Sequence, residues 1–366
     1  MTNASDSPAA EARGEGRILA RSVHVSERER GSVETVDGLR AAAPPTPAAP
    51  DGDGPAATFR HPALFYRGEA EYLDGTLPFV LDGLAVGEPV AVAVPGPRLD
   101  LLRTALGPSA DAVHFTDMTR AGRNPGRIIP CVLRAFYDAR AAAGPVRIIG
   151  EPIWPGRTAL EYPACVQHEA LINAAFDGRA ATILCPYDAA ALPPDVLLDA
   201  FATHPVVIDG GRERISERYA PEATAAACNS PLAPPCRAAA FAFDGERLRA
   251  ARQFAVRVAE SLGVGGRPLE DLALAVAELT TNSVLHGGGS GEILVWAEDG
   301  QVACEVRDRG VLGDPLAGRR VPETGRPGGR GLLMVNHLAD LVRVHTGPGG
   351  TAIRFYLAAA PDLAAR

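Results

Sequence analysis

Two polar residues, four positions apart in the sequence, are of types that can bind a metal ion and transfer a proton. Glu278 and Asn282 lie in the run ELTTNSVLHG, whose apolar spacing predicts a helix that ends at Gly287. Residues four apart share one face of a helix, so both side chains can meet the same ligand. The amide oxygen of Asn282 suits Mg²⁺, and the Glu278 carboxylate can orient or deprotonate an attacking group. Because this spacing is common on solvated helices, its meaning depends on the segments C-terminal to Gly287.

Glycine-rich segments come after that helix in a definite order. A predicted strand ends at Asp308 and Gly310, the loop 325–332 (GRPGGRGL) opens a second helix, and Gly349-Gly350-Thr351 precede the last strand. A carboxylate at a strand end can accept from an adenine amino group, and glycines at a helix start leave N–H groups free for phosphates. The candidate nucleotide-binding residues are Asn282, Asp308, Gly310, Arg326, Gly328, Gly329, Arg330, Gly331, Leu332 and Thr351.

In this order the segments resemble the N, G1, G2 and GT boxes of the GHKL (Bergerat) ATPases, from about Phe241 to Leu357. The runs LAVAELTTNSVLHG and GRGLLMVNHLAD are most similar to RsbW-type anti-sigma-factor serine kinases. The resemblance implies ATP and Mg²⁺ as cofactors, Glu278 as catalytic base, Asn282 as the Mg²⁺ ligand and Asp308 as the adenine reader. It also implies a serine or threonine of a STAS-type anti-sigma-factor antagonist as phosphoacceptor, a sigma factor as a further partner, and a dimer.

Two features depart from that family pattern. A fuller G1 box reads D-x-G-x-G, whereas Val311 and Leu312 follow Gly310 here. The chain contains no lysine, which leaves Arg326 and Arg330 as charge partners for phosphate. The departures keep open a non-catalytic alternative, in which a degenerate ATP site only serves to sequester a partner.

A sensor histidine kinase is another alternative. That class needs a phosphoaccepting histidine on a two-helix hairpin before its ATP-binding domain. Residues 212–237 read instead as a Pro-rich linker with the run CNSPLAPPC, and no histidine occurs between His204 and His286. A histidine acceptor would therefore have to lie on another chain.

The N-terminal part predicts an α/β domain. Residues 1–58 have the composition of a disordered tail, and short β-rich runs then alternate with helical spacing, which is typical of a mostly parallel sheet covered by helices. The pattern is similar to RecA-like sheets, yet no P-loop motif occurs. We expect two α/β domains, at 59–211 and 238–358, and a C-terminal tail at 359–366. The strand runs are 89–95, 112–117, 146–152, 181–188 and 205–211.

The segment from Phe59 to Gly211 resembles the MEDS sensory domain. The similarity rests on HPALFYRGEAEYLDGTLPFVLDGLAVGEPVAVAVP, IIGEPIWPGR, HEALINAAF, CPYD and the His204-Pro205 pair. It implies that the domain senses a small molecule, such as a hydrocarbon derivative. The alternative is that its polar residues only hold loops and strand ends together. The pocket candidates are His61, Tyr66, Glu151, Trp154, Glu169, Asn173, Cys185 and Tyr187.

Composition limits the remaining functions. A net charge of -8 and a pI of about 5.6 give no general reason to bind nucleic acid. Six cysteines occur without a CxxC pair, so the sequence indicates neither a zinc motif nor a disulfide framework, and Cys185 is either a reactive thiol or a buried structural one. No signal peptide and no run of eighteen apolar residues is present, so we expect a cytoplasmic protein without membrane contact.

Overall fold

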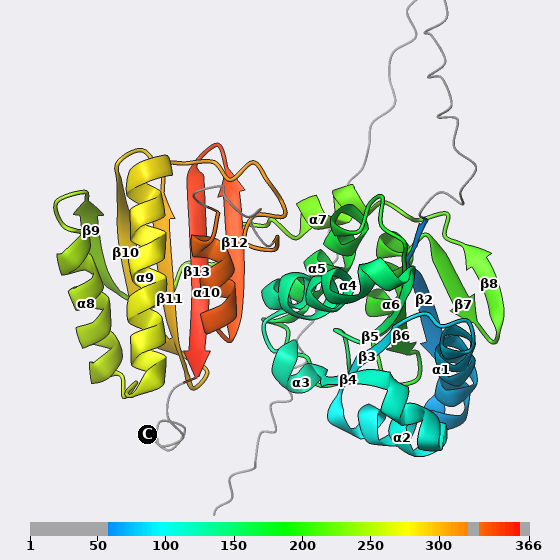
Figure 1. The fold of residues 1–366 in the computed structure, drawn as a ribbon. Coiled ribbons are helices and arrows are strands. Elements are labelled where there is room, and N and C mark those ends of the chain that lie inside the picture. Colours follow the sequence, from blue (N-terminus) through cyan, green and yellow to red (C-terminus); the bar gives the residue numbers. More distant parts are fainter. Residues whose placement is uncertain (1–57, 321–328, 359–366) are drawn as a thin grey trace, which may run out of the picture. The chain divides into compact units, whose positions relative to one another are not determined.

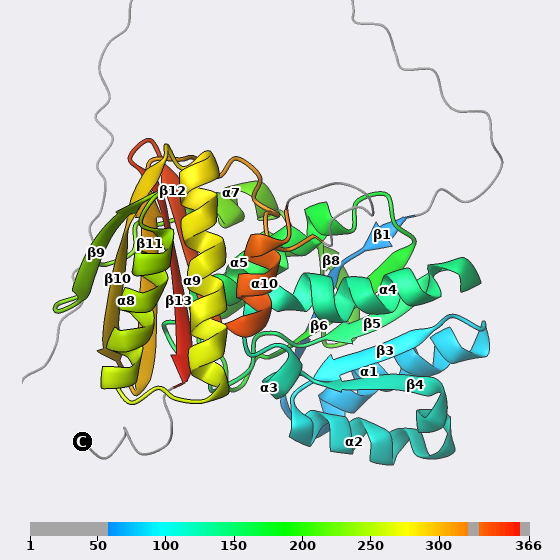
Figure 2. The same ribbon diagram turned by 60° about the vertical axis from the view of Figure 1, so that its left-hand side comes forward.

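A computed structural model of the chain describes residues 58–320 and 329–358, which form an α/β protein with two separate sheets (Figures 1 and 2). The predicted fold class, two α/β domains of which the first has a mostly parallel sheet and the second the α/β sandwich of the Bergerat type, is confirmed. No helix in these ranges is long and apolar enough to cross a membrane.

The N-terminal sheet is parallel except at one edge. Its strands run in the order β4-β3-β5-β6-β2-β7-β8, β1 pairs with β6, and only the β7–β8 pairing is antiparallel. All five predicted strands are present. The strands are β1 (Phe59–Arg60), β2 (Pro62–Tyr66), β3 (Val90–Val94), β4 (Val113–Asp117), β5 (Val146–Gly150), β6 (Ala181–Asp188), β7 (Val206–Asp209) and β8 (Arg212–Ile215).

Helices cover both faces of this sheet, because successive strand residues point to opposite sides. Leu64, Val92 and Leu184 pack on one side with α1 and α2, whereas Phe65 and Cys185 pack on the other side with α4 to α6. The helices are α1 (Gly68–Ala85), α2 (Gly96–Leu106), α3 (Met118–Ala121), α4 (Arg134–Arg140), which continues a π-helical turn at Ile129–Leu133, α5 (Tyr162–Ala175) and α6 (Pro194–Thr203).

The segment predicted as a linker contains regular structure. Strand β8, with the sequence RERI, extends the sheet, and α7 (Pro221–Ala227) follows it. Every residue of β8 is exposed, so an edge strand of this kind carries no alternation of apolar and polar residues for a pattern to detect. The domain boundaries themselves stay a proposal.

The C-terminal domain is a five-stranded antiparallel sheet in the order β12-β13-β11-β10-β9, with α8, α9 and α10 side by side on one face (Figure 1). A tight hairpin turn joins β10 to β11 at Asp299 and Gly300, which both have positive φ, 49° and 74°. The elements are β9 (Ala239–Asp244), α8 (Leu248–Ser261), α9 (Arg267–His286), β10 (Ser290–Glu298), β11 (Gln301–Asp308), α10 (Gly331–Leu338), β12 (Leu341–Gly347) and β13 (Gly350–Ala358).

Candidate functional site

Helix α9 presents Glu278 and Asn282 to the start of α10. The closeness is measured at Gly331, the first residue of α10, where a Cβ would lie 2.7 Å from Glu278 Oε2 and 3.0 Å from Asn282 Nδ2. Both side chains are partly buried. A glycine at this position therefore lets the backbone approach the carboxylate and the amide closely.

The N-terminus of α10 is suited to bind an anion. Among the residues that the structure describes, no side chain caps it, which leaves its first N–H groups available to an acceptor, and the helix dipole favours negative charge there. Gly329 and Arg330 just before it are exposed, and Gly329 has a φ of 76°. Leu332 is buried and packs in the domain core. The candidates Arg326 and Gly328 lie outside the described residues.

Asp308 is held at the end of β11 by two donors. Ser283 Oγ donates to Asp308 Oδ2 over 2.6 Å, and the amide of Gly310 donates to Oδ1 over 2.8 Å. A Cβ on Gly287 would lie 2.3 Å from Asp308 Cγ, so the end of α9 touches this carboxylate directly. Ser283 was not among the sequence candidates, although it follows Asn282 immediately.

Thr351 makes a hydrogen bond to the backbone just after Asp308. Its hydroxyl donates to Gly310 O over 2.8 Å and lies 2.8 Å from Thr346 Oγ1, which accepts from the amide of Leu312 over 2.9 Å. The departure from the G1 pattern is therefore ordered, because hydroxyls at the end of the β12–β13 pair fix the segment that contains Val311 and Leu312.

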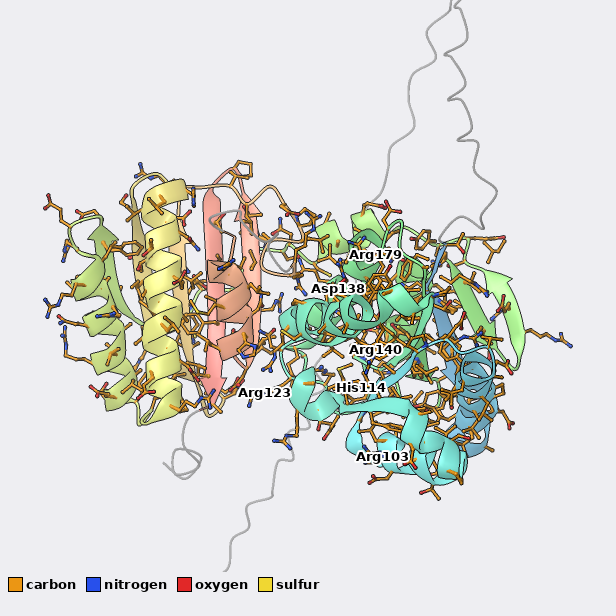
Figure 3. All side chains as sticks on the ribbon, viewed as in Figure 1. Arg103, His114, Arg123, Asp138, Arg140 and Arg179 are labelled. Carbon is orange, nitrogen blue, oxygen red and sulfur yellow. The ribbon has the colours of Figure 1, made fainter. Side chains whose placement is uncertain are left out.

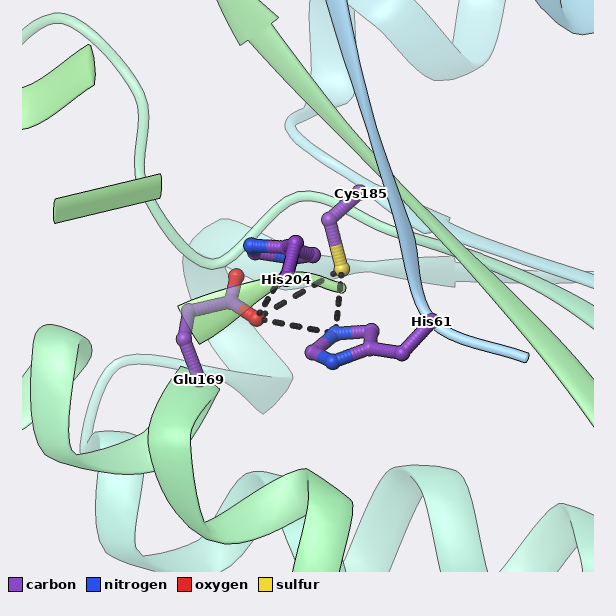
Figure 4. Close-up of side chains that lie close together, drawn as sticks. All are labelled: His61, Glu169, Cys185 and His204. Atoms are coloured by element: carbon purple, nitrogen blue, oxygen red, sulfur yellow. Dashed lines mark hydrogen bonds and ion pairs between the residues drawn. The ribbon is translucent and has the colours of Figure 1, made fainter. Parts of the chain in front are cut away.

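The pocket candidates of the N-terminal domain separate into two groups on opposite faces of the sheet. His61, Glu169, Asn173 and Cys185 lie together on the α5 face and are joined there by His204, which the sequence analysis noted only as part of a His-Pro pair (Figure 4). Tyr187 belongs to the same group, with its ring edge-on to His204 at 5.6 Å.

Short distances connect this first group. Glu169 Oε2 lies 3.3 Å from His61 Nε2 and 3.5 Å from His204 Nε2, and Cys185 Sγ lies 3.3 Å from His61 Nε2 and 3.5 Å from Glu169 Oε2. All four side chains are fully buried. On the outer side of the rings, His61 Nδ1 lies 3.1 Å from Asn173 Oδ1, and His204 Nδ1 lies 2.9 Å from the carbonyl of Ala200.

Burial governs the ionisation of this group. It lowers the pKa of His61 to about 4 and raises the pKa of the Cys185 thiol well above its usual range. Burial alone would raise the pKa of Glu169 too, but its contacts with His204 and His61 hold that pKa well below its usual range. A protonated, inaccessible thiol is a poor nucleophile, so the structure does not favour a freely reactive Cys185.

The second group lies on the α1–α2 face. Tyr66 donates to Glu151 Oε1 over 3.3 Å, and the Arg98 guanidinium lies 5.1 Å from the centre of the Tyr66 ring. Burial raises the pKa of Glu151 to about 8. Trp154 joins neither group, since its ring stacks against Arg157 at 3.8 Å.

A cavity of about 630 Å³ opens near the carboxyl end of β4, where ligands of parallel sheets commonly bind. Arg123, labelled in Figure 3, is one of its residues, and none of the sequence candidates lines it. The lining consists of Thr116, Asp117, Thr119, Arg120, Ala121, Arg123 and Arg127.

Comparison with known proteins agrees with both resemblances. Residues 60–205 match the MEDS domain, the methanogen/methylotroph, DcmR sensory domain, and residues 241–357 match the histidine kinase-like ATPase domain. No curated protein matches the chain. A solved structure, the RsbU and RsbW domains of Rv1364c from Mycobacterium tuberculosis, has 21% identity and a TM-score of 0.26 over 34% of this chain. The match covers 33% of that chain, so only about a third of its length is shared.

Proposed function

We propose that this protein, which joins a MEDS sensory domain to a histidine kinase-like ATPase domain, is an ATP-dependent anti-sigma regulatory kinase. Its substrate would be a serine or threonine of a STAS-type anti-sigma-factor antagonist. The N-terminal domain would modulate the reaction when it binds a small molecule.

The observation that carries the proposal is the close approach of Glu278 and Asn282 to the start of α10. The Glu278 carboxylate and the Asn282 amide meet the first backbone N–H groups of α10 there, around Gly331. The Asp308 carboxylate, which accepts from Ser283, lies farther along α9, at its C-terminal turn. This combination suits a nucleotide whose base and phosphates are held at different points.

Each residue has a distinct role in the proposed transfer. Asp308 accepts from the adenine amino group, and the amide oxygen of Asn282 is suited to hold Mg²⁺, which neutralises phosphate charge when bound. Glu278 takes the proton from the attacking hydroxyl of the partner as that oxygen bonds to the γ-phosphorus, the bond from that phosphorus to the bridging oxygen breaks, and ADP leaves. Arg330 and the first amides of α10 bind phosphate oxygens.

The region before the ATPase domain favours transfer to a partner. Residues 212–237 are all described and contain β8 and the seven-residue α7, not a two-helix hairpin. No histidine lies in that segment. An acceptor on a second protein is therefore better supported than a histidine of this chain.

The proposal is tested by incubating the full chain with γ-labelled ATP, Mg²⁺ and STAS-domain proteins. We expect transfer by the wild type and a fall of about 100-fold or more in Asn282→Ala, the scale on which one transition-state contact is lost. Thr281→Ala is the matched control, because Thr281 is exposed one position earlier on α9. No transfer from the wild type, or undiminished transfer from Asn282→Ala, would disprove the proposal.

A partner-sequestering protein without turnover is the second candidate. It is favoured by the Asp308 carboxylate, which already accepts from Ser283 and Gly310, and by the changed G1 segment. Isothermal titration of the full chain with MgATP separates the two functions. The kinase proposal expects micromolar affinity that Asp308→Ala abolishes. Absence of binding, or binding that does not depend on Asp308, favours sequestration.

A further inference from the structure

Four donor atoms of the kinds that bind transition metals meet inside the N-terminal domain (Figure 4). They are the Nε2 atoms of His61 and His204, Glu169 Oε2 and Cys185 Sγ, all within 4.8 Å of one another. They come from four separate places: the residue before β2, a residue just before β7, helix α5 and strand β6. Nothing in the proposed kinase reaction uses them.

The distances between these atoms match the edges of a tetrahedral zinc site. Zinc binds nitrogen and oxygen at about 2.0–2.2 Å and sulfur at about 2.3 Å, so neighbouring ligand atoms lie about 3.3–3.6 Å apart. Four of the measured separations are 3.3, 3.5, 3.3 and 3.5 Å. Four of the six edges therefore already have the spacing that a single ion requires, and the remaining two, from His204 Nε2 to His61 Nε2 and to Cys185 Sγ, are at most 4.8 Å.

The outer contacts of the two imidazoles orient their lone pairs toward the centre. Asn173 Nδ2 donates to the carbonyls of Thr203 and Ala170, so its Oδ1 is the atom that accepts from His61 Nδ1. His204 Nδ1 donates to the carbonyl of Ala200. Each Nε2 then presents a lone pair to the cluster, the arrangement found behind metal-binding histidines.

Without a cation the centre has too many acceptors. Two imidazole lone pairs, a carboxylate oxygen and a sulfur face one another, and the thiol supplies a single proton. Among the residues that the structure describes, Glu169 Oε1 and His204 Nε2 are buried without any hydrogen-bond partner. Buried acceptors of this kind are costly unless something positive lies between them.

We propose that His61, Glu169, Cys185 and His204 bind one divalent transition-metal ion, zinc by the chemistry of the donors. Two neutral imidazoles, a carboxylate and a thiolate form a mixed nitrogen, oxygen and sulfur set that zinc accepts tetrahedrally. The two negative charges neutralise the dication, so the buried site carries no net charge. The Cys185 proton is released to solvent when the sulfur binds the metal.

Four protein ligands leave no open position, so the ion joins parts of the fold and does not activate water. The ion connects α5 to the N-terminal ends of β2 and β7 and to the middle of β6. Because the ligands come from both ends of the domain's sequence, removal of the ion should loosen the domain as a whole.

The first test uses the wild-type full chain. After purification under reducing conditions and reconstitution with Zn²⁺ alone, we expect one zinc per chain and an X-ray absorption shell with one sulfur and three nitrogen or oxygen atoms. Chelation should lower Tm. A chain that retains no zinc, or a shell without sulfur, overturns the proposal whatever the variants do.

The second test assigns the ligands. Cys185→Ser and His204→Gln should each weaken Zn²⁺ binding by at least about 100-fold and remove or alter the thiolate-to-metal absorption of the Co²⁺-substituted chain. Cys165→Ser is the matched control, since Cys165 is an equally buried thiol one turn before Glu169 on α5. Wild-type affinity in either ligand variant, with folding verified by circular dichroism, overturns the assignment. If a variant does not fold, the wild-type shell decides.

Discussion

At the scale of single residues, Glu151 is a carboxyl placed where its charge is least favourable. Its side chain is buried, it accepts from Tyr66, and its Oε2 atom has no partner among the described residues. Burial raises the pKa of Glu151 from 4.5 to about 8, so the folded chain carries this group protonated at neutral pH.

Glu151 should therefore make stability depend on pH. Between about 4.5 and about 8 the folded chain retains a proton that the unfolded chain releases, so this contribution to the free energy of unfolding decreases as pH rises. The slope is at most about 1.4 kcal/mol per pH unit. Urea unfolding across this range should show a flatter dependence for Glu151→Gln than for the wild type. The exposed Glu69→Gln variant is the control, and equal slopes in all three proteins would contradict the assignment.

Local spacing predicted some site residues better than others. Glu278 and Asn282 share a helix face because residues four apart always do, and both approach Gly331. Ser283 and Asp308 are 25 positions apart in the sequence, and their contact depends on how α9 packs against β11. The spacing of residues along the sequence gives no information on that packing. His204 had one usable signal: His61-Pro62 and His204-Pro205 are identical pairs that enter β2 and β7, two strands paired in parallel.

At the scale of elements, glycines decide how closely the parts of the nucleotide site approach. Gly350 begins β13 with a φ of 115°, and a Cβ there would lie 2.0 Å from the backbone oxygen of Asp308. At Gly331 the nearest atom would instead be the flexible end of Glu278. The two positions should consequently respond differently to alanine.

We expect Gly350→Ala to destabilise the fold by about 2 kcal/mol or more, because backbone atoms have to move and the φ is unfavourable for alanine. Gly349→Ala should stay within about 0.5 kcal/mol, since its Cβ would meet nothing within 4 Å. Chemical denaturation of the full chain measures both. Similar stabilities of the two variants would show that the approach to Asp308 is not tight.

Gly331→Ala should preserve the fold yet displace the Glu278 carboxylate. Phosphotransfer would then fall more than MgATP affinity, because Glu278 is assigned to the chemical step. Titration and transfer assays on the same preparation provide the comparison. Normal transfer by this variant would argue against Glu278 as the base.

Element boundaries were predicted well where periodicity is strong. Strands β3 to β7, the end of helix α9 and the start of helix α10 lie within a few residues of their predicted positions, since each element buries a regular apolar face. Strand β8 is exposed throughout and was not predicted. It pairs with β7 through antiparallel backbone hydrogen bonds, and Arg214 donates to the Asp209 carboxylate over 3.2 Å.

At the scale of the whole molecule, the sequence predicted the fold class and both domain families, which the family matches at 60–205 and 241–357 confirm. The pocket prediction did not resolve that its residues lie on opposite sides of one sheet. Alternate residues of a strand point to opposite faces, which places Tyr66 of β2 and Cys185 of β6 on different sides of the sheet. This follows only once β2 is known to pair with β6, and that pairing became known from the fold.

The proposed transfer of phosphate to a hydroxyl of another protein is tested by the chemical stability of the phosphate that is transferred. After the full chain, labelled MgATP and a STAS-domain partner have reacted, the products are separated and exposed to acid. Phosphoserine and phosphothreonine survive acid, whereas phosphohistidine does not. We expect acid-stable label on the partner that is absent with Asn282→Ala. Acid-labile label on a histidine of this chain would show that the phosphoacceptor is not a hydroxyl of a partner.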